Sequence, residues 1–152
     1  MNGLQLYQKY GDPYKFKGLA LWDVPTELEI GIIPKKIYCN KDLIKPLEKA
    51  FKLLIETGAV NDLKTYDGCY NIRPIRGYEK KVADLIKSNR VSDAMLYMSN
   101  HSWGTAIDFN AFENQLGATP KMSKRVVDCF LQSGFVWGGN FQRKDGMHFE
   151  LG

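Results

Sequence analysis

The residues best suited to chemistry are the only two histidines of the 152-residue chain and the aspartates beside them. Asp108 follows His101 by seven positions, and Asp145 precedes His148 by three. Two imidazoles and one carboxylate form a ligand set that zinc accepts when it keeps a fourth position for water. A further carboxylate nearby can serve that water as a general base. Since each residue alone is more often structural, the prediction rests on their coincidence, which favours zinc held by His101, Asp108 and His148 with Asp145 as the base.

The spacing of the first pair requires the chain to fold back on itself. A helix from His101 to Asp108 would rise roughly 10 Å, and an extended strand would span roughly 23 Å. Neither lets both side chains reach one ion through bonds of about 2.0–2.2 Å. Gly104 stands between them and can adopt turn conformations that other residues avoid. We therefore predict a turn at Gly104, followed by a strand over 106–109 with Ala106 and Asp108 on one face.

The second pair is predicted at the start of another strand. An offset of three would place Asp145 and His148 on opposite faces of a regular strand. We therefore expect Asp145 to occupy a turn, with Gly146 as its pivot, and residues 147–151 to form the strand.

These two segments together resemble the signature of a known family. The pattern is Ser99-x-His101-x-x-Gly104-x-Ala106-x-Asp108, followed by Asp145-x-x-His148. It is similar to the D-alanyl-D-alanine carboxypeptidase/L-alanyl-D-glutamate endopeptidase family, zinc enzymes that cut the stem peptides of bacterial peptidoglycan and include phage endolysins. The resemblance covers residues 36–152. It implies the hedgehog/D-Ala-D-Ala peptidase-like fold of the wider superfamily.

Two further segments resemble parts of the same family. Residues 68–77 resemble its arginine-bearing segment, and residues 135–139 resemble the strand before its last ligand. The resemblance favours Arg73 as the residue that stabilises the oxyanion formed when water attacks an amide. Arg76 is an alternative, either as a substrate-binding residue or as the partner of a surface carboxylate.

Two other residues are candidates for substrate binding. Trp137 can shape the wall of the pocket, although a structural role suits it equally. Ser99 lies within the first motif, where its hydroxyl can also hydrogen-bond inside its own loop.

The cysteines give little support to another chemistry. Cys39, Cys69 and Cys129 are odd in number and show no CxxC spacing, so we expect neither a disulfide framework nor a thiolate cluster. Most are expected to be small core residues. Cys69 near the arginine segment is a minor alternative as a nucleophile.

The function that these patterns favour is a phage-type L-alanyl-D-glutamate endopeptidase. The resemblance implies that zinc activates water and polarises the scissile carbonyl, while Asp145 transfers the proton. Family members often carry Glu where this chain has Asp145, which disfavours carboxypeptidase specificity. A D-alanyl-D-alanine carboxypeptidase or dipeptidase stays an alternative, as does a non-catalytic zinc-stabilised binding module.

Composition is that of a globular protein with a modest positive charge. The chain is 44% hydrophobic and 25% charged, with a formal net charge of +4. Its basic residues are scattered and match no nucleic-acid motif, so we expect no binding to nucleic acid. We also expect a monomer. The first residues lack a signal peptide's pattern, and no apolar run could span a membrane. We expect synthesis in the host cytoplasm and action on the cell wall after release or delivery.

The remaining patterns predict an α+β fold with a small antiparallel sheet flanked by helices. Residues 1–35 are expected to form an extended arm, with a short strand or hairpin, packed on a catalytic domain of residues 36–152. Helices are predicted from residue 43 to Gly58, over 79–87, and from 119–120 to Gly134, the last with Val126, Val127, Phe130 and Leu131 facing inward. Strands are predicted over 36–39, 65–70, 106–109, 135–137 and 147–151.

Overall fold

A four-stranded antiparallel sheet lies at the centre of the computed structural model, which describes residues 1–152. Its strands, in spatial order, are β3 (Tyr66–Gly68), β4 (Ala106–Phe109), β6 (His148–Leu151) and β5 (Phe135–Trp137). The two central strands, β4 and β6, contain Asp108 and His148. The predicted α+β fold with an antiparallel sheet is confirmed.

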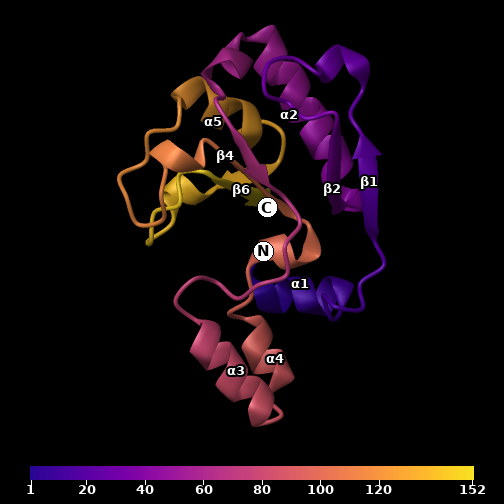
Figure 1. Ribbon diagram of the computed structural model, residues 1–152, viewed down its shortest axis with the longest axis vertical. Coiled ribbons are helices and arrows are strands. Elements are labelled where there is room, and N and C mark those ends of the chain that lie inside the picture. Colours follow the sequence, from indigo (N-terminus) through magenta and orange to yellow (C-terminus); the bar gives the residue numbers. More distant parts are fainter.

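Two helices cover one face of this sheet (Figure 1). They are α2 (Ile44–Glu56) and α5 (Lys124–Leu131), and their apolar residues join the inward side chains of β4 and β6 in one core cluster. Within it the rings of Phe130 and Phe149 stack with their centroids 4.1 Å apart. The predicted helix ending near Gly58 is confirmed, because Gly58 follows the end of α2 with a left-handed φ of 78°.

Helix α5 differs from its prediction at both ends. It begins at Lys124 rather than at 119–120, because side chains hold the preceding residues: Asn114 Oδ1 accepts from the Lys121 amide, and Asp62 accepts from Ser123 Oγ. Leu131 does not face inward and is 44% exposed. Leu131 is the last residue of the helix and lies outside the buried set Val126, Val127, Cys129 and Phe130.

The first 40 residues contain a helix that the sequence analysis did not predict. Helix α1 (Gly3–Tyr10) begins with a capping box in which Asn2 and Gln5 bind each other's backbone amides. After it, β1 (Leu19–Asp23) pairs with β2 (Lys36–Asn40) in a separate two-stranded antiparallel sheet. The expectation of an extended segment is therefore wrong for residues 3–10, whereas the short strand is present.

Helix α1 packs on a second, smaller core around Trp103. The Trp103 indole donates to the carbonyl of Gly11 at 2.8 Å, and Leu6 is fully buried beside it. Contacts with residues nearly a hundred positions away thus stabilise a helix too short to be stable alone.

The remaining helices are short. Helices α3 (Glu79–Lys87) and α4 (Val91–Met95) form a hairpin that projects from the body of the molecule (Figure 1). The first matches its predicted range, and the second was not predicted. Single 3₁₀ turns occur at Thr26–Leu28, Lys41–Leu43, Ala59–Asp62, Asn100–Trp103, Ala111–Glu113 and Gly138–Asn140. None of the helices combines the length and the apolarity needed to cross a bilayer.

Candidate functional site

The polar face of the central sheet carries the candidate site. In the register of β4 and β6, Asp108 lies opposite His148, and Ala106 lies opposite Glu150. Because side chains alternate along a strand, all four lie on one face, while Ile107 and Phe149 point into the core beneath α2 and α5. The sheet therefore separates the core from a polar surface that holds two carboxylates and an imidazole.

The chain returns His101 to this face through the predicted turn. His101 lies in a 3₁₀ turn that ends at Gly104, whose φ of 68° is left-handed. A Cβ on Gly104 would also lie only 2.6 Å from the Asn40 amide nitrogen, so a side chain has no room there. Ser99 begins the turn by accepting a hydrogen bond from the His101 amide at 3.3 Å.

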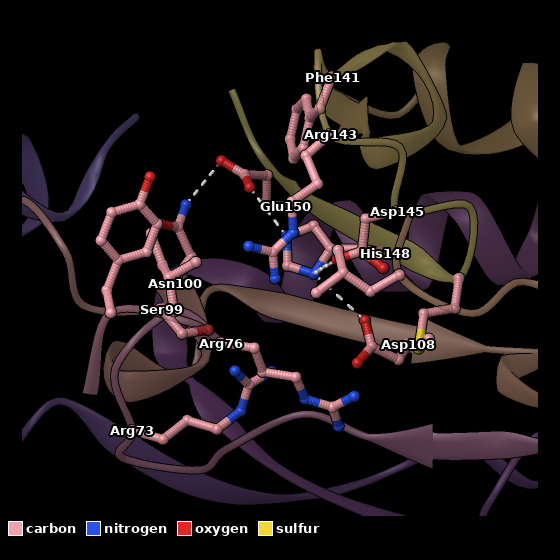
Figure 2. Close-up of a pocket in the computed structure, with 14 residues that line it drawn as sticks. Arg73, Arg76, Ser99, Asn100, Asp108, Phe141, Arg143, Asp145, His148 and Glu150 are labelled. Carbon is pink, nitrogen blue, oxygen red and sulfur yellow. Dashed lines mark hydrogen bonds and ion pairs between the residues drawn. The ribbon is translucent and has the colours of Figure 1, made fainter. Parts of the chain in front are cut away.

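The three predicted ligands converge. His101 Nε2 lies 3.1 Å from Asp108 Oδ2, and His148 Nδ1 lies 3.2 Å from Asp108 Oδ1. One ligand atom from each of the three residues lies within 4.8 Å of the others. Two ligands at about 2.0 Å from one tetrahedral ion are separated by about 3.3 Å, so this spacing suits a single small cation. Figure 2 shows Asp108 and His148 side by side in this arrangement.

The hydrogen bonds of the imidazoles support the same conclusion. The carbonyl of Cys69 can only accept, so His101 Nδ1, at 2.5 Å, must be its protonated nitrogen. His101 Nε2 is then free, and it is the only buried side-chain nitrogen or oxygen without a hydrogen-bond partner. Leaving such an atom unpaired costs about 1–3 kcal/mol. A metal ion would satisfy it, so the residues present fit zinc.

The second imidazole is arranged in the same manner. His148 Nε2 lies 2.8 Å from Glu150 Oε1 and donates to it, which leaves Nδ1 facing Asp108. Each histidine therefore has one nitrogen fixed by an acceptor and the other directed at Asp108, as is usual for metal-ligating histidines; on His148 a metal would replace the proton of Nδ1.

The electrostatic environment favours positive charge at this point. Burial alone would raise the pKa of Asp108, but its interactions with the two imidazoles hold the pKa below its ordinary value. Burial alone would lower the pKa of His148, but its hydrogen bonds with Asp108 and Glu150 raise that pKa to about 10. The same carboxylates that favour a proton here would favour a metal cation.

Asp145 lies beside this cluster without joining it. Its Oδ2 is 3.9 Å from His148 Nδ1, and its side chain is 24% exposed. Burial raises the pKa of its carboxyl, helped by the charge of Asp108 and opposed by nearby cationic groups that include Arg73. A carboxylate with an elevated pKa at the edge of a metal site suits a general base.

A glycine makes this position of Asp145 possible. The Asp145 amide donates to the carbonyl of Gly138 at 2.9 Å, and its own carbonyl accepts from the His148 amide at 3.1 Å. A Cβ on Gly138 would lie 2.4 Å from the Asp145 carbonyl oxygen. Gly138 therefore allows the close approach that fixes the position of Asp145.

Gly146 lies at the centre of the predicted turn, because the Asp145 carbonyl accepts from the His148 amide three residues later. Its φ is not positive, so the turn itself does not require a glycine. A Cβ there would lie 2.5 Å from Asn114 Oδ1. Close packing against Asn114 is therefore the reason for a glycine in this turn.

A cleft of about 260 Å³ opens over the cluster. Figure 2 shows side chains from several separate segments around it. Among the predicted residues it is lined by Arg73, Arg76, Ser99, Asp108, Asp145 and His148, and among the others by Asn100, Phe141, Arg143 and Glu150.

Arg73 is held in this cleft through its backbone. Its amide donates to Ser102 Oγ at 3.1 Å, and its carbonyl accepts from the Ser99 amide at 3.0 Å. These bonds attach the arginine segment to the loop that carries His101. Arg73 lies near enough to Asp145 for the positive charge of Arg73 to oppose, in part, the rise that burial causes in the pKa of Asp145.

Trp137 is the one predicted substrate-binding residue that the structure does not bring to the cleft lining; His101 is also absent from the lining but belongs to the ligand cluster. Its indole donates to the carbonyl of Gly146 at 2.9 Å, and its ring packs closely against Gly139. These contacts are structural and support the loop that carries Asp145.

The sequence analysis also missed Glu150, Asn100 and Arg143. Glu150 could have been found, since it lies two residues after His148 on a predicted strand and must share its face. No local pattern indicates the other two.

Cys69 contributes its backbone rather than its thiol. Burial raises the pKa of the Cys69 thiol well above its ordinary value, so the nucleophilic thiolate does not form. Cys39, Cys69 and Cys129 are all free and buried, as expected of core residues.

Comparison with known proteins agrees with this geometry. The sequence model of a family described as D-alanyl-D-alanine carboxypeptidase matches residues 93–151. No curated protein and no solved structure matches the chain significantly. The matched segment contains His101, Asp108, Asp145 and His148, so the part of the chain that builds the cluster is the part that is similar to this peptidase family.

Proposed function

We propose that this protein is a zinc-dependent peptidase that hydrolyses the stem peptides of peptidoglycan. The observation that carries the proposal is the convergence of His101, Asp108 and His148, with the unpartnered Nε2 of His101 facing the other two. The match of residues 93–151 to the D-alanyl-D-alanine carboxypeptidase family supports the substrate class.

The chain's own groups divide the work of amide hydrolysis. Zinc held by the three ligands would supply Lewis-acid polarisation and lower the pKa of water. Asp145, beside His148 and partly open to the cleft, takes the proton of the attacking water and returns it to the departing amine. Arg73, which lines the same cleft, donates to the oxyanion, a role in which losing one donor raises the barrier by about 2.7–4 kcal/mol.

Within this class we favour an L-alanyl-D-glutamate endopeptidase. The support is Asp145, an aspartate where members of the family that the chain resembles often carry glutamate. The second candidate is a D-alanyl-D-alanine carboxypeptidase, favoured by the description of the matched family. Mass spectrometry of muropeptides that retain N-acetylmuramic acid separates them. A carboxypeptidase removes a single alanine from the C-terminus, whereas an endopeptidase leaves N-acetylmuramyl-L-alanine and releases the rest of the stem peptide.

The experiment that tests the shared chemistry is Asp145→Asn. We expect the variant to bind zinc as the wild type does and to lose on the order of 10²–10⁴ in kcat. Asp84→Asn is the matched control, because Asp84 is an exposed residue of α3 paired only with Lys80. If Asp145→Asn retains both zinc and full turnover, Asp145 is not the base. If the wild type binds zinc and stem peptide but releases no product, the protein is a binding module instead.

A further inference from the structure

The arginines of the chain fall into two groups by their partners. Arg90 and Arg125, outside the cleft, each pair with an aspartate, Asp93 at 2.8 Å and Asp62 at 2.6 Å. The other three, Arg73, Arg76 and Arg143, all line the cleft and form no ion pair.

The carboxylates of the cleft do not neutralise these arginines. Asp108 and Glu150 are directed at the imidazole of His148, and Asp145 lies beside the same ring. The cleft thus separates its charges. The carboxylates lie at the metal-ligand cluster, and the guanidinium groups have no carboxylate partner, although Arg73 Nη1 donates to the Pro74 carbonyl at 3.3 Å.

Two of these arginines come from segments that meet across the cleft. Arg143 belongs to the loop between Gly138 and Asp145, whereas Arg76 precedes Gly77 in the loop before α3. Arg143 Nη1 lies only 3.4 Å from the point that a Cβ on Gly77 would occupy. In Figure 2, Arg143 approaches the cluster from one side, and Arg73 and Arg76 approach it from the other.

We infer that Arg143, together with Arg76, binds a carboxylate of the substrate close to the scissile amide. This inference rests on the proposed function, and it makes Arg143 a specificity-determining residue that selects acidic peptides. A guanidinium group presents a planar fork of donors that matches a carboxylate, and such charge-assisted bonds are about twice as strong as neutral ones. Arg73 keeps its separate proposed role, which is to stabilise the oxyanion.

The chemistry of stem peptides offers two sources for this anion. In an L-alanyl-γ-D-glutamyl peptide, the free α-carboxylate of the D-glutamate lies next to the scissile amide. In a peptide ending in D-alanyl-D-alanine, the terminal carboxylate does. In either peptide, converting that carboxylate to a primary amide removes the charge with little change in size.

The test compares each free-acid peptide with its amide on the wild type and on Arg143→Gln. We expect the wild type to favour the free acid at least tenfold in kcat/KM, and Arg143→Gln to reduce that preference to less than threefold, mainly through KM. Lys144→Gln is the control, because it removes one positive charge from the same loop at an exposed residue that does not line the cleft. The peptide that shows the effect identifies the source of the carboxylate.

The outcomes separate this inference from the proposed function. If Arg143→Gln lowers kcat/KM equally for the free-acid peptide and its amide, or lowers it for neither, Arg143 does not recognise the carboxylate. This conclusion holds whichever peptide bond the enzyme cuts. Calorimetric binding of the same peptides to zinc-loaded protein measures the preference without turnover. If no peptide is hydrolysed, yet the free acid binds in a manner that depends on Arg143, the peptidase function fails and the anion site stands.

Discussion

His148 Nε2 lies 2.8 Å from Glu150 Oε1, and both residues are buried on the same face of β6. The other oxygen of Glu150 accepts from Asn100 Nδ2 at 2.6 Å. Asn100 adjoins His101, so the carboxylate connects the strand that holds one imidazole with the turn that holds the other. Glu150 therefore orients His148 so that its Nδ1 faces Asp108 and His101.

From this follows the prediction that Glu150→Gln weakens zinc binding. Outer carboxylates that hold a ligating histidine typically contribute 10–100-fold in metal affinity. We expect the dissociation constant for zinc, measured by competition with a chromogenic chelator, to rise by about tenfold or more, because the amide keeps the shape but loses the charge. Glu56→Gln on the exposed end of α2 is the control. An unchanged affinity in a folded Glu150→Gln protein would show that the contact does not orient the ligand.

Gly138→Ala is predicted to impair catalysis more than zinc binding. The added methyl would lie 2.4 Å from the Asp145 carbonyl oxygen, which must move, and 3.1 Å from His148 Cβ, which must shift only slightly. Because a displacement of about 1 Å in an active site can lower the rate about 100-fold, we expect a loss of that size in kcat/KM, measured on protein saturated with zinc. Gly152→Ala is the control, since its new methyl would make only an ordinary contact, 3.4 Å from the Gly134 carbonyl oxygen. Full activity in Gly138→Ala would contradict this account of how Asp145 is positioned.

Local patterns in the sequence predicted much of the fold because several elements here are locally specified. The apolar spacing in α2, the range of α3 and the turn at Gly104 all follow from neighbouring residues. The meeting of His101, Asp108 and His148 was predictable for a chemical reason, since few other arrangements of these ligands could serve one ion.

The features that the sequence analysis predicted wrongly or missed share a different cause: each depends on contacts between segments that are distant in the sequence. Helix α1 is fixed by packing against the segment around Trp103, and the start of α5 is set by Asn114 and Asp62. Arg143 reaches the cleft only because the loop around Gly138 closes over β6. No pattern of neighbouring residues contains these relationships, so a single sequence could not reveal them.

Asp62→Asn is predicted to reduce stability in a way that depends on pH. Hydrogen bonds from Arg125, the largest effect, and from Ser123 lower the pKa of Asp62 from 3.8 to about 2. A carboxyl whose pKa is lower in the folded state stabilises the protein fully above its unfolded pKa and loses that contribution as pH falls through the folded pKa. The side chains of Arg125 and Asp62 are 50% and 31% exposed, so solvent screens the pair and we expect a loss of only about 1 kcal/mol at pH 7.

The measurement is urea unfolding of both proteins at pH 7 and at successively lower pH. The difference between wild type and Asp62→Asn should shrink from about pH 4 downward and be nearly gone near pH 2. Asp128→Asn, which breaks an exposed pair with Lys124 on α5, should show a smaller difference at pH 7. A difference that stays constant over this pH range would mean that the charge of Asp62 is not its source.

Zinc is predicted to stabilise the folded chain, because the unfolded chain does not hold the three ligands together. A ligand that binds only the folded state at 100 times its dissociation constant adds about 2.7 kcal/mol to the free energy of unfolding. Removing zinc with a chelator should reverse this gain and leave His101 Nε2 again without a partner. Asp108→Asn should lose most of the zinc-dependent increase in Tm, because the amide is a weaker ligand than the carboxylate. Asp84→Asn should keep the whole increase. A zinc-dependent rise in Tm of equal size in Asp108→Asn would place the ion elsewhere on the protein and remove the basis for its role in catalysis.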